Sequence, residues 1–384
     1  MKYNNGVYSL TLKTQLFQYH EKNSHLVDFA DFKMPLWYEG VGPECLAVRN
    51  SVGIFDISHM GRTFVSGPDA EAFLNYVTTN NVTTLRSNHA QYTLLCNSEG
   101  GIKDDLVIFK LGDNQYLVVF NAGNREKDFT WIQKNSKDYK VELKEASNET
   151  AMISIQGPKA LATVQKLTTT NLSETIRFDC MFAKISEKEC ILSRTGYTGE
   201  DGIEISVMNA SVNDPSKALE LWEDILKAGK DYEIKPCGLG ARDVLRLEAG
   251  MCLYGNDITE STNPLEARLS FVVKVDKGDF IGKEAIIRKK EDGIKIKRVG
   301  LRVIGKGIPR AKCKIIKNSE NIGTVTSGTY SPLLNLGIAM GYVPIEYSNE
   351  GNKVSIEVHG KLIDAEIVGV PFYDPKIYGV KRSS

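Results

Sequence analysis

The chain has 384 residues, of which 42% are hydrophobic and 25% charged, enough apolar material to bury sizeable cores in two or three domains. Lys plus Arg and Asp plus Glu both number 48, so the formal net charge is zero, which argues against a nucleic acid or an anionic membrane as partner. The seven cysteines contain no CxxC pair and the five histidines show no metal-ligand spacing, which argues against a disulfide framework and a metal site.

The chain also lacks the usual signals for membrane insertion or export. No apolar run approaches the roughly 18 residues of a membrane-spanning helix. The N-terminal stretch MKYNNGVYSLTLKT has neither a secretory apolar segment nor an Arg-rich amphipathic leader. We therefore expect a protein of a reducing compartment, the cytoplasm, or the mitochondrial matrix if the source is a eukaryote.

The region from 55 to 120 predicts a helix followed by an antiparallel meander. FDISHMG (55–61) contains His59, but no serine or cysteine stands at a motif spacing, so we interpret this histidine as structural. A helix is predicted over 69–78, where apolar residues recur on one stripe. Three β-rich runs follow, QYTLLCN, GIKDDLVIFKL and QYLVVFNA, and a polar turn at 112–114 joins the last two as a hairpin.

Two adjacent carboxylates, Asp104 and Asp105, stand inside the second of these runs. Successive strand residues point to opposite faces, and both faces here are largely apolar. At least one carboxylate is therefore expected in poorly solvated surroundings, where a charge is costly. The same alternation directs Asp104 away from Asp105.

The segment SRTGYTGEDGIEIS (193–206) is rich in glycine, but it fits neither the Walker pattern nor GxGxxG, so a phosphate site is weakly supported. Glu204 alternates there with two isoleucines, and the pattern alone favours a solvent-facing side chain. A helix is predicted over 215–228, with Asp214 as its N-cap and Gly229 as its stop.

A further helix is predicted over 238–249, with Arg242 and Arg246 one turn apart on the same face. This pair has two open interpretations, an exposed helix surface or a clamp for a carboxylate. After about residue 285 the chain consists of short strands separated by Gly, Asn and Ser turns, which predicts a small barrel or sandwich. The charged stretch RKKEDGIKIKR (288–298) is interpreted as the connector. We find no short internal repeat.

Nine segments in order resemble the aminomethyltransferase (T-protein) family of the glycine cleavage system, over nearly the whole chain. They are MPLWY, AVRNSVGIFDISHMG, GGIKDDLV, FNAGNREKD, IQGP, RTGYTGEDGIEI, KPCGLGARDVLRLEAGMCLYGND, GTVTSGTYSP and GVPFYDP. The resemblance implies an α+β fold in a three-domain cloverleaf. Two interleaved α/β domains would form the folate-binding aminomethyltransferase region over 1–284, and a β-barrel-like domain would occupy 285–384.

The resemblance also implies the reaction. Such a protein takes an aminomethyl group carried on the dihydrolipoyl arm of a lipoylated partner, H-protein. It transfers the one-carbon unit to tetrahydrofolate, releases ammonia and forms 5,10-methylenetetrahydrofolate, without a metal.

Site residues carry over one by one. Asp105 matches the catalytic aspartate, Glu204 the glutamate that holds the pterin, and Arg242 a folate-contacting arginine. The positions that match other folate contacts are all aromatic or amide side chains: Tyr92, Asn121, Tyr197 and Tyr378. Asp104 would then be structural. The family's usual FAGW is FADF here, with Asp31 and Phe32, which changes an entry loop and leaves these assignments in place.

Two alternatives remain open from the sequence. One is another tetrahydrofolate-dependent enzyme of this fold, such as a demethylase. The other is a non-catalytic folate-binding protein, whose related family carries KGCYxGQE; this chain has KGDFIGKEA (277–285), without the cysteine. Because the expected partner is usually acidic, candidate docking residues are basic: Arg49, Arg62, Arg125 and the RKK at 288–290.

Overall fold

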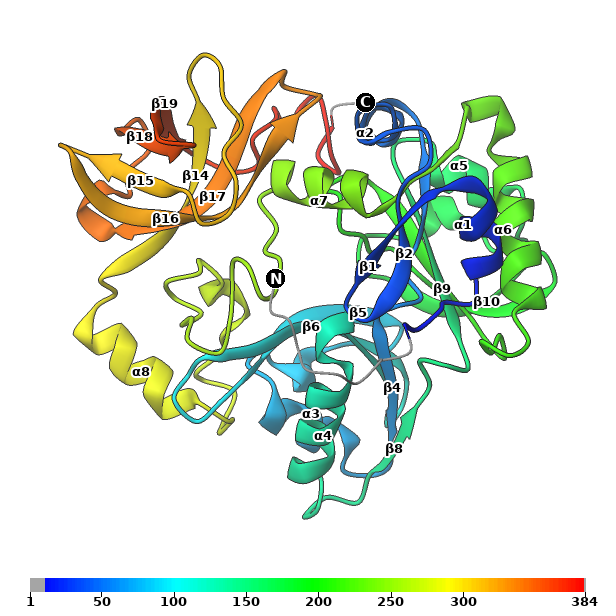
Figure 1. Cartoon of the computed structure of the whole chain (residues 1–384). Coiled ribbons are helices and arrows are strands. Elements are labelled where there is room, and N and C mark those ends of the chain that lie inside the picture. The colour runs from blue at the N-terminus through cyan, green and yellow to red at the C-terminus, as the bar shows by residue number, and fades with distance from the viewer. Residues whose placement is uncertain (1–10, 383–384) are drawn as a thin grey trace.

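The computed structural model describes residues 11–382, so the leader prediction falls mostly on residues outside this range. The chain forms three lobes in a cloverleaf (Figure 1). A five-stranded sheet, in the order β5-β6-β7-β4-β8, forms the first lobe, and a six-stranded sheet, β10-β11-β12-β9-β3-β13, forms the second. Strands β14 to β19 close into a six-stranded barrel. The predicted cloverleaf with a C-terminal barrel is confirmed.

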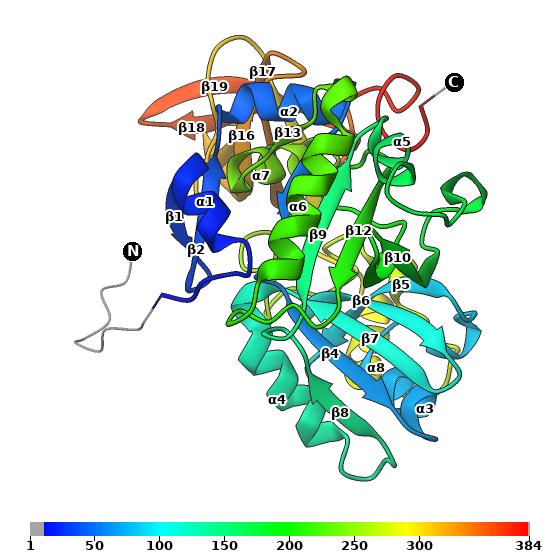
Figure 2. The same cartoon turned by 90° about the vertical axis from the view of Figure 1, so that its right-hand side faces the viewer.

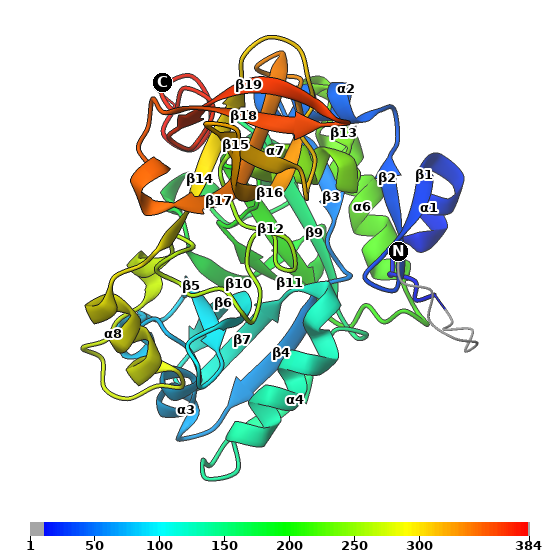
Figure 3. The same ribbon diagram turned by 60° about the vertical axis from the view of Figure 1, so that its left-hand side comes forward.

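The first lobe packs its sheet against two helices around a core that includes Phe73, Leu106 and Val118. Figure 3 shows this lobe below the barrel. Its elements are β4 (Gly61–Ser66), α3 (Ala70–Val77), β5 (His89–Cys96), β6 (Ile102–Gly112), β7 (Gln115–Phe120), α4 (Arg125–Asn135) and β8 (Glu142–Glu145).

The second lobe is entered twice by the chain, which interleaves the two lobes. Its strand β3 precedes the whole first lobe in sequence, yet it pairs with β9, which follows that lobe, through Ile54 opposite Ile155. Helix α6 covers this sheet (Figure 2) and buries Trp222 completely. The elements are α2 (Val41–Asn50), β3 (Gly53–Asp56), β9 (Ala151–Gln156), α5 (Ala160–Gln165), β10 (Cys180–Ile185), β11 (Lys188–Ser193), β12 (Gly202–Val207), α6 (Ser216–Ala228), β13 (Lys235–Pro236) and α7 (Leu239–Glu248).

The remaining elements are the N-terminal helix and hairpin, the barrel and the short 3₁₀ turns. Helix α7 runs between the second lobe and the barrel (Figure 1). These elements are α1 (Phe17–Asn23), β1 (His25–Phe29), β2 (Phe32–Trp37), α8 (Lys283–Asp292), β14 (Ile296–Val303), β15 (Lys314–Lys317), β16 (Glu320–Ser331), β17 (Leu336–Pro344), β18 (Lys353–Val358), β19 (Lys361–Val368), η1 (Val82–Thr84), η2 (Ala122–Asn124), η3 (Leu172–Glu174), η4 (Lys230–Tyr232), η5 (Ser270–Val272) and η6 (Ile345–Tyr347).

Several element predictions hold, and two need correction. The helices predicted over 69–78 and 238–249 and the hairpin are present as α3, α7 and β6–β7. Helix α6 begins at Ser216, and its N-cap is Pro215 rather than Asp214. Asp214 instead accepts a hydrogen bond from the Ser216 hydroxyl, at 2.8 Å.

The connector predicted over 288–298 is wrong, because α8 runs to Asp292 and β14 begins at Ile296. Helix α8 follows Gly282, whose φ is +89°. It is rich in helix-forming Glu, Ala, Lys and Arg, and it buries Ile286. The run of charges is the exposed face of an amphipathic helix. The division of the chain into 1–284 and 285–384 stays a prediction.

Candidate functional site

Asp105 lies on β6 and is partly buried. Its Oδ2 accepts a hydrogen bond from the Tyr92 hydroxyl at 3.0 Å, and its Oδ1 accepts one from Asn121 Nδ2 at 2.9 Å. Burial raises the pKa of Asp105 to about 7, the charge of Asp104 adds to this, and the hydrogen bonds from Tyr92 and Asn121 oppose it. A carboxyl with this pKa is able to exchange a proton near neutral pH.

Asp104 is not separated from Asp105 as the strand alternation predicts. The register between β5 and β6 shifts beside it, since Asp104 pairs with Leu95 but Cys96 pairs with Ile102, which makes Lys103 the extra residue of a bulge. Independently of this bulge, the Asn121 side chain reaches both carboxylates, with its Nδ2 2.9 Å from Asp104 Oδ1 and 2.9 Å from Asp105 Oδ1. Asp104 is fully buried and belongs to the surroundings of Asp105.

Glu204, on β12 of the second lobe, accepts a hydrogen bond from Thr195 Oγ1 at 2.5 Å. Burial raises the pKa of this carboxyl, while the hydrogen bond from Thr195 and the charge of Arg242 lower it. Glu204 is only partly exposed, so it is not the freely solvated strand residue that the alternation favours.

Arg242, on α7, places its guanidinium 4.7 Å from the centre of the Tyr197 ring, and its Nη2 lies 3.8 Å from Met60 Sδ. Burial lowers the pKa of Arg242, and the charge of Glu204 opposes this shift. The next arginine of the helix, Arg246, is 1% exposed and binds Asp257 at 2.6 Å. Neither arginine is on an exposed helix surface, so that interpretation is wrong.

Tyr197 contacts Arg242 and the segment that follows α7. It lies in the glycine-rich segment, and its hydroxyl donates to the carbonyl of Cys252. Burial raises the pKa of Tyr197. The charges of Arg246 and Arg242 lower this pKa, and the charge of Asp105 raises it further. The structure therefore gathers most of the candidate residues: Tyr92, Asp105, Asn121, Tyr197, Glu204 and Arg242.

Tyr378 is not brought into this group by any contact in the described part of the chain. Its ring packs edge-on against Tyr373 at 6.4 Å, with the Arg382 guanidinium 5.6 Å from its centre. His59 is buried, and burial lowers its pKa to about 3, so the ring stays neutral between its aromatic neighbours Phe29 and Phe32. That environment agrees with a structural histidine.

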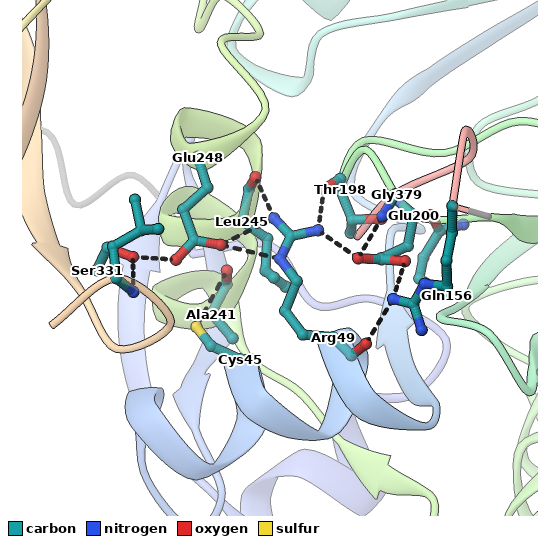
Figure 4. Close-up of polar contacts among 12 residues, drawn as sticks. Cys45, Arg49, Gln156, Thr198, Glu200, Ala241, Leu245, Glu248, Ser331 and Gly379 are labelled. Carbon is teal, nitrogen blue, oxygen red and sulfur yellow. Dashed lines mark hydrogen bonds and ion pairs between the residues drawn. The ribbon is translucent and has the colours of Figure 1, made fainter. Parts of the chain in front are cut away.

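A buried ion network fixes the glycine-rich segment (Figure 4). Arg49 Nη1 donates to the Thr198 carbonyl and to Glu200 Oε1, both at 2.9 Å. The same guanidinium binds Glu248 Oε2 on α7 at 2.8 Å. Glu248 in turn accepts a hydrogen bond from Ser331 of the barrel at 2.6 Å. The network links the second lobe, α7 and the barrel behind Tyr197.

This network and a second buried arginine correct the docking hypothesis. Arg49 and Arg62 are both 0% exposed, so neither is available to a partner. Arg62 is used inside the protein, where its Nε donates to Thr150 Oγ1 at 2.8 Å. Basic character alone did not separate these two arginines from exposed ones, and no pattern in the neighbouring residues marks them as buried.

No group of three or more His, Cys, Asp or Glu side chains in residues 11–382 is arranged to hold a metal ion. Within the same residues, no helix combines the length and the apolar character that crossing a membrane requires. All seven cysteines are free. The site is therefore described by carboxylates, amides, aromatic rings and one guanidinium.

Comparisons with known proteins agree with this architecture. Residues 16–277 match the GCVT N-terminal domain, and residues 297–374 match the glycine cleavage T-protein C-terminal barrel domain. An aminomethyltransferase of Caldanaerobacter subterraneus is 46% identical over 94% of this chain and 96% of its own, and a probable aminomethyltransferase of Pyrococcus horikoshii is 42% identical over 97% and 99%. The crystal structure of the glycine cleavage system aminomethyltransferase T from Bartonella henselae covers 94% of this chain and 98% of its own, with a TM-score of 0.87 and 34% identity. The chain belongs to the aminomethyltransferase family, the T-proteins of the glycine cleavage system.

Proposed function

We propose that this protein transfers the one-carbon unit of an aminomethyl group from the dihydrolipoyl arm of H-protein to tetrahydrofolate. Ammonia is released and 5,10-methylenetetrahydrofolate is formed. The observation that carries the proposal is the Asp105 carboxyl, held between Tyr92 and Asn121 and grouped with Glu204 and Arg242 of other elements. Family membership supports the same reaction.

The residues present fit tetrahydrofolate as the acceptor. Its pterin carries several N–H donors, and a carboxylate offers about four acceptor positions. Thr195 occupies one of these positions on Glu204, which leaves others for the pterin. Arg242, whose described contacts are a thioether and an aromatic ring, supplies a positive charge nearby. We assign pterin binding to Glu204 and folate contacts to Arg242, Tyr92, Asn121 and Tyr197.

Asp105 suits the chemistry of the transfer. When ammonia leaves, the carbon that is attacked becomes electron-poor, and a fixed carboxylate in a poorly solvated site stabilises positive charge there. The attacking folate nitrogen loses a proton when the new C–N bond forms. Asp105, with a pKa of about 7, is able to accept that proton near neutral pH. Tyr378, which lies with Tyr373 rather than with this group, stays a proposed folate contact by resemblance alone.

The lipoyl arm needs a path to Asp105 from the surface. A cavity of about 770 Å³ adjoins the group through Ala122 and Gly123, the residues that follow Asn121. The rest of the lining comes from Leu12, Lys103, the β1–β2 turn and α4. Its charged residues are the cations Lys103, Arg125, Lys127 and Lys134 and the carboxylates Asp31 and Glu126, so cations are in the majority. We propose that an acidic H-protein docks over this cavity. The RKK residues Arg288 and Lys289 line a separate cavity of about 400 Å³ beside α8.

The decisive experiment is a tetrahydrofolate-dependent assay with aminomethyl-loaded H-protein. We expect ammonia and methylenetetrahydrofolate in equal amounts, and much slower turnover with a free dihydrolipoamide adduct. Equal use of the free adduct would reject the docking proposal. Turnover of an N-methyl or sulfonium substrate instead would favour the demethylase alternative, and folate binding without any turnover would favour the non-catalytic one.

The docking surface has its own test. Lys134→Glu should raise the KM for H-protein and leave that for tetrahydrofolate unchanged, because Lys134 is exposed at the cavity and makes no contact with the group around Asp105. Added salt should act in the same direction, since screening becomes strong beyond about 10 Å at 0.1 M. Lys361→Glu, at an exposed residue that begins barrel strand β19, is the control. The free cysteines support a reducing location, and we propose the cytoplasm.

A further inference from the structure

Asp128, on α4, is a buried carboxyl that the proposed reaction does not use. It is 0% exposed, and neither of its oxygens receives a hydrogen bond from a donor in residues 11–382. An ionised carboxylate can only accept hydrogen bonds, and a buried charge without donors is strongly disfavoured. The geometry therefore requires a neutral Asp128. A neutral carboxyl has an O–H to donate, and Asp104 is the neighbouring carboxylate that raises the pKa of Asp128.

The charges around Asp128 support the neutral form. Burial raises the pKa of Asp128 to about 11, and the charge of Asp104 adds to this, while Lys127 and Lys103 oppose it. Both lysines are engaged elsewhere. Lys127 Nζ donates to the Tyr254 hydroxyl at 2.9 Å, and Lys103 Nζ pairs with Glu260 at 3.2 Å. No cation is left to pair directly with Asp128 among the described salt bridges.

Asp104 has the opposite environment. Its Oδ1 accepts from Asn124 Nδ2 at 2.7 Å and from Asn121 Nδ2 at 2.9 Å, and its Oδ2 accepts from the Asn121 backbone N–H at 3.0 Å. Three N–H donors point at this carboxyl, whereas no donor in residues 11–382 points at Asp128, so Asp104 is placed as the acceptor of the pair and Asp128 as the donor. Within the pair, the proton therefore sits on Asp128.

Asn121 transmits this arrangement to Asp105. Its Nδ2 lies 2.9 Å from Asp104 Oδ1, 2.9 Å from Asp105 Oδ1 and 3.1 Å from the Asp105 carbonyl oxygen. All three partners are acceptors, so the amide must present its nitrogen to them. The side chain is fixed on one side by Asp104, and on the other side it holds the carboxylate of Asp105.

We propose that Asp128 is a positioning residue, which holds a proton, donates it in a hydrogen bond to Asp104, and through Asp104 and Asn121 orients the Asp105 carboxylate. The inference rests on the catalytic role proposed for Asp105. The proton also limits charge in the cluster. With Asp128 neutral, only Asp104 and Asp105 are negative when Asp105 is ready to act, and a third negative charge would make it harder for Asp105 to ionise.

The first test measures the proton itself by infrared spectroscopy of the full-length protein. At about pH 9, where an ordinary carboxyl is ionised, the protein should still show a carboxylic-acid C=O band that shifts in heavy water. The band should disappear in Asp128→Asn and persist in Asp105→Asn. Absence of the band in the unsubstituted protein would overturn the proposal.

The second test compares two substitutions in the H-protein-dependent assay. Asp128→Leu removes the donor, and we expect kcat to fall by roughly 10- to 100-fold, as for a displacement of about 1 Å at a catalytic group, with little change in the KM for tetrahydrofolate. Asp128→Asn keeps a neutral donor and should restore most of this loss. Its pH profile should match the unsubstituted enzyme, because no charge has been removed.

The outcomes separate this inference from the proposed function. If Asp128→Asn shifts the acid limb of kcat to lower pH, Asp128 was ionised and the inference is wrong. An Asp128→Leu protein that folds and keeps full kcat would also overturn it. If Asp128→Leu does not fold, the band and the Asp128→Asn profile decide. The proposed role of Asp105 is tested by Asp105→Asn in the same assay, and substantial activity there would reject that role whatever the infrared band shows.

Discussion

The first and second lobes contain the same succession of elements, although the sequence shows no short repeat. Strand β4, α3, η1 and β5–β7 in one lobe correspond to β9, α5, η3 and β10–β12 in the other. The strand orders β5-β6-β7-β4 and β10-β11-β12-β9 match as well. Local details agree too: Gly67 and Gly157 precede the helices with φ of +122° and +125°. Asn81 and Asn171 each cap the following 3₁₀ turn.

The lobes differ in which connection is long. In the first lobe, residues 97–101 separate β5 from β6, while residues 113–114 make a tight turn to β7. In the second lobe, residues 186–187 make the tight turn and residues 194–201 form the long connection. Asp105 follows the first long connection, and Glu204 follows the second. The common framework sets the position of the strands, and the candidate site lies where the lobes diverge.

The largest effect is expected on the rate of transfer, which we assign to Asp105 of the first lobe. Asp105→Asn keeps the shape of the side chain and removes its charge, so it should slow transfer by about 2.7–4 kcal/mol of barrier while tetrahydrofolate still binds. Single-turnover rates with loaded H-protein measure this. Glu189→Gln, an exposed carboxylate on the corresponding strand β11, is the control and should be neutral. If Glu189→Gln slowed transfer as much as Asp105→Asn, the catalytic role would not be specific to Asp105 of the first lobe.

The second lobe should contribute binding rather than rate. Glu204→Ala removes an acceptor for the pterin, and a hydrogen bond to a charged group is worth roughly 1.5–3 kcal/mol. Calorimetry should show that loss in tetrahydrofolate affinity, with a smaller effect on the rate at saturation. An unchanged dissociation constant would mean that Glu204 does not hold the ligand.

The pH dependence sharpens the view of Asp105. Because the proposed base must be ionised, turnover should rise as the pH increases through about 7, the pKa that burial gives Asp105. The hydrogen bond from Tyr92 lowers this pKa, so Tyr92→Phe should move the rise to higher pH, by roughly one unit. The stability effect has the opposite sign. Since the folded pKa is raised above 3.8, the contribution of Asp105 is greatest below that pH and is lost as the pH rises to about 7.

The smallest effect is expected on stability, when the corresponding asparagine caps of the two lobes, Asn81 and Asn171, are each replaced. Asn81 accepts a hydrogen bond from the Thr83 N–H at 3.1 Å, and Asn171 accepts one from the Ser173 N–H at 3.2 Å. Each Asn→Ala change should cost about 1 kcal/mol or less of unfolding free energy, because both caps are exposed. Chemical denaturation should give similar losses. A large difference between the two losses of unfolding free energy would show that the corresponding turns contribute unequally to stability.

Features that depend on neighbouring residues could be predicted from the sequence, and features that depend on residues far apart in the chain could not be read from local patterns. Helix α3 and the β6–β7 hairpin were predictable because periodicity and turn residues are local signals. No local pattern indicated the interleaving of the lobes, since β3 finds its partner β9 far along the chain, and only the family resemblance implied it. The repeat was missed because it is conserved in element order and little in residues.

The candidate site shows the same limit. Spacing alone left Glu204 solvent-facing and Arg242 undecided, and only the resemblance of nine segments placed them with Asp105. The amide of Asn121, which both carboxylates share, is a contact from the end of the neighbouring strand β7 that the strand alternation of β6 does not reveal. The burial of Arg49 depends on acceptors that lie at 198, 200 and 248.

Those acceptors also set the order in which the protein can be completed during synthesis. Arg49 leaves the ribosome early, yet Glu248 is made much later, and the Gly379 N–H and Arg382 that bind Glu200 come last. Until Glu248 has been made, the cation of α2 lacks one of the two carboxylates that bind it, and its burial is costly. The network around Glu200 is thus complete only when the C-terminal segment arrives, and a chain that ends before Gly379 lacks two of the donors that hold this carboxylate.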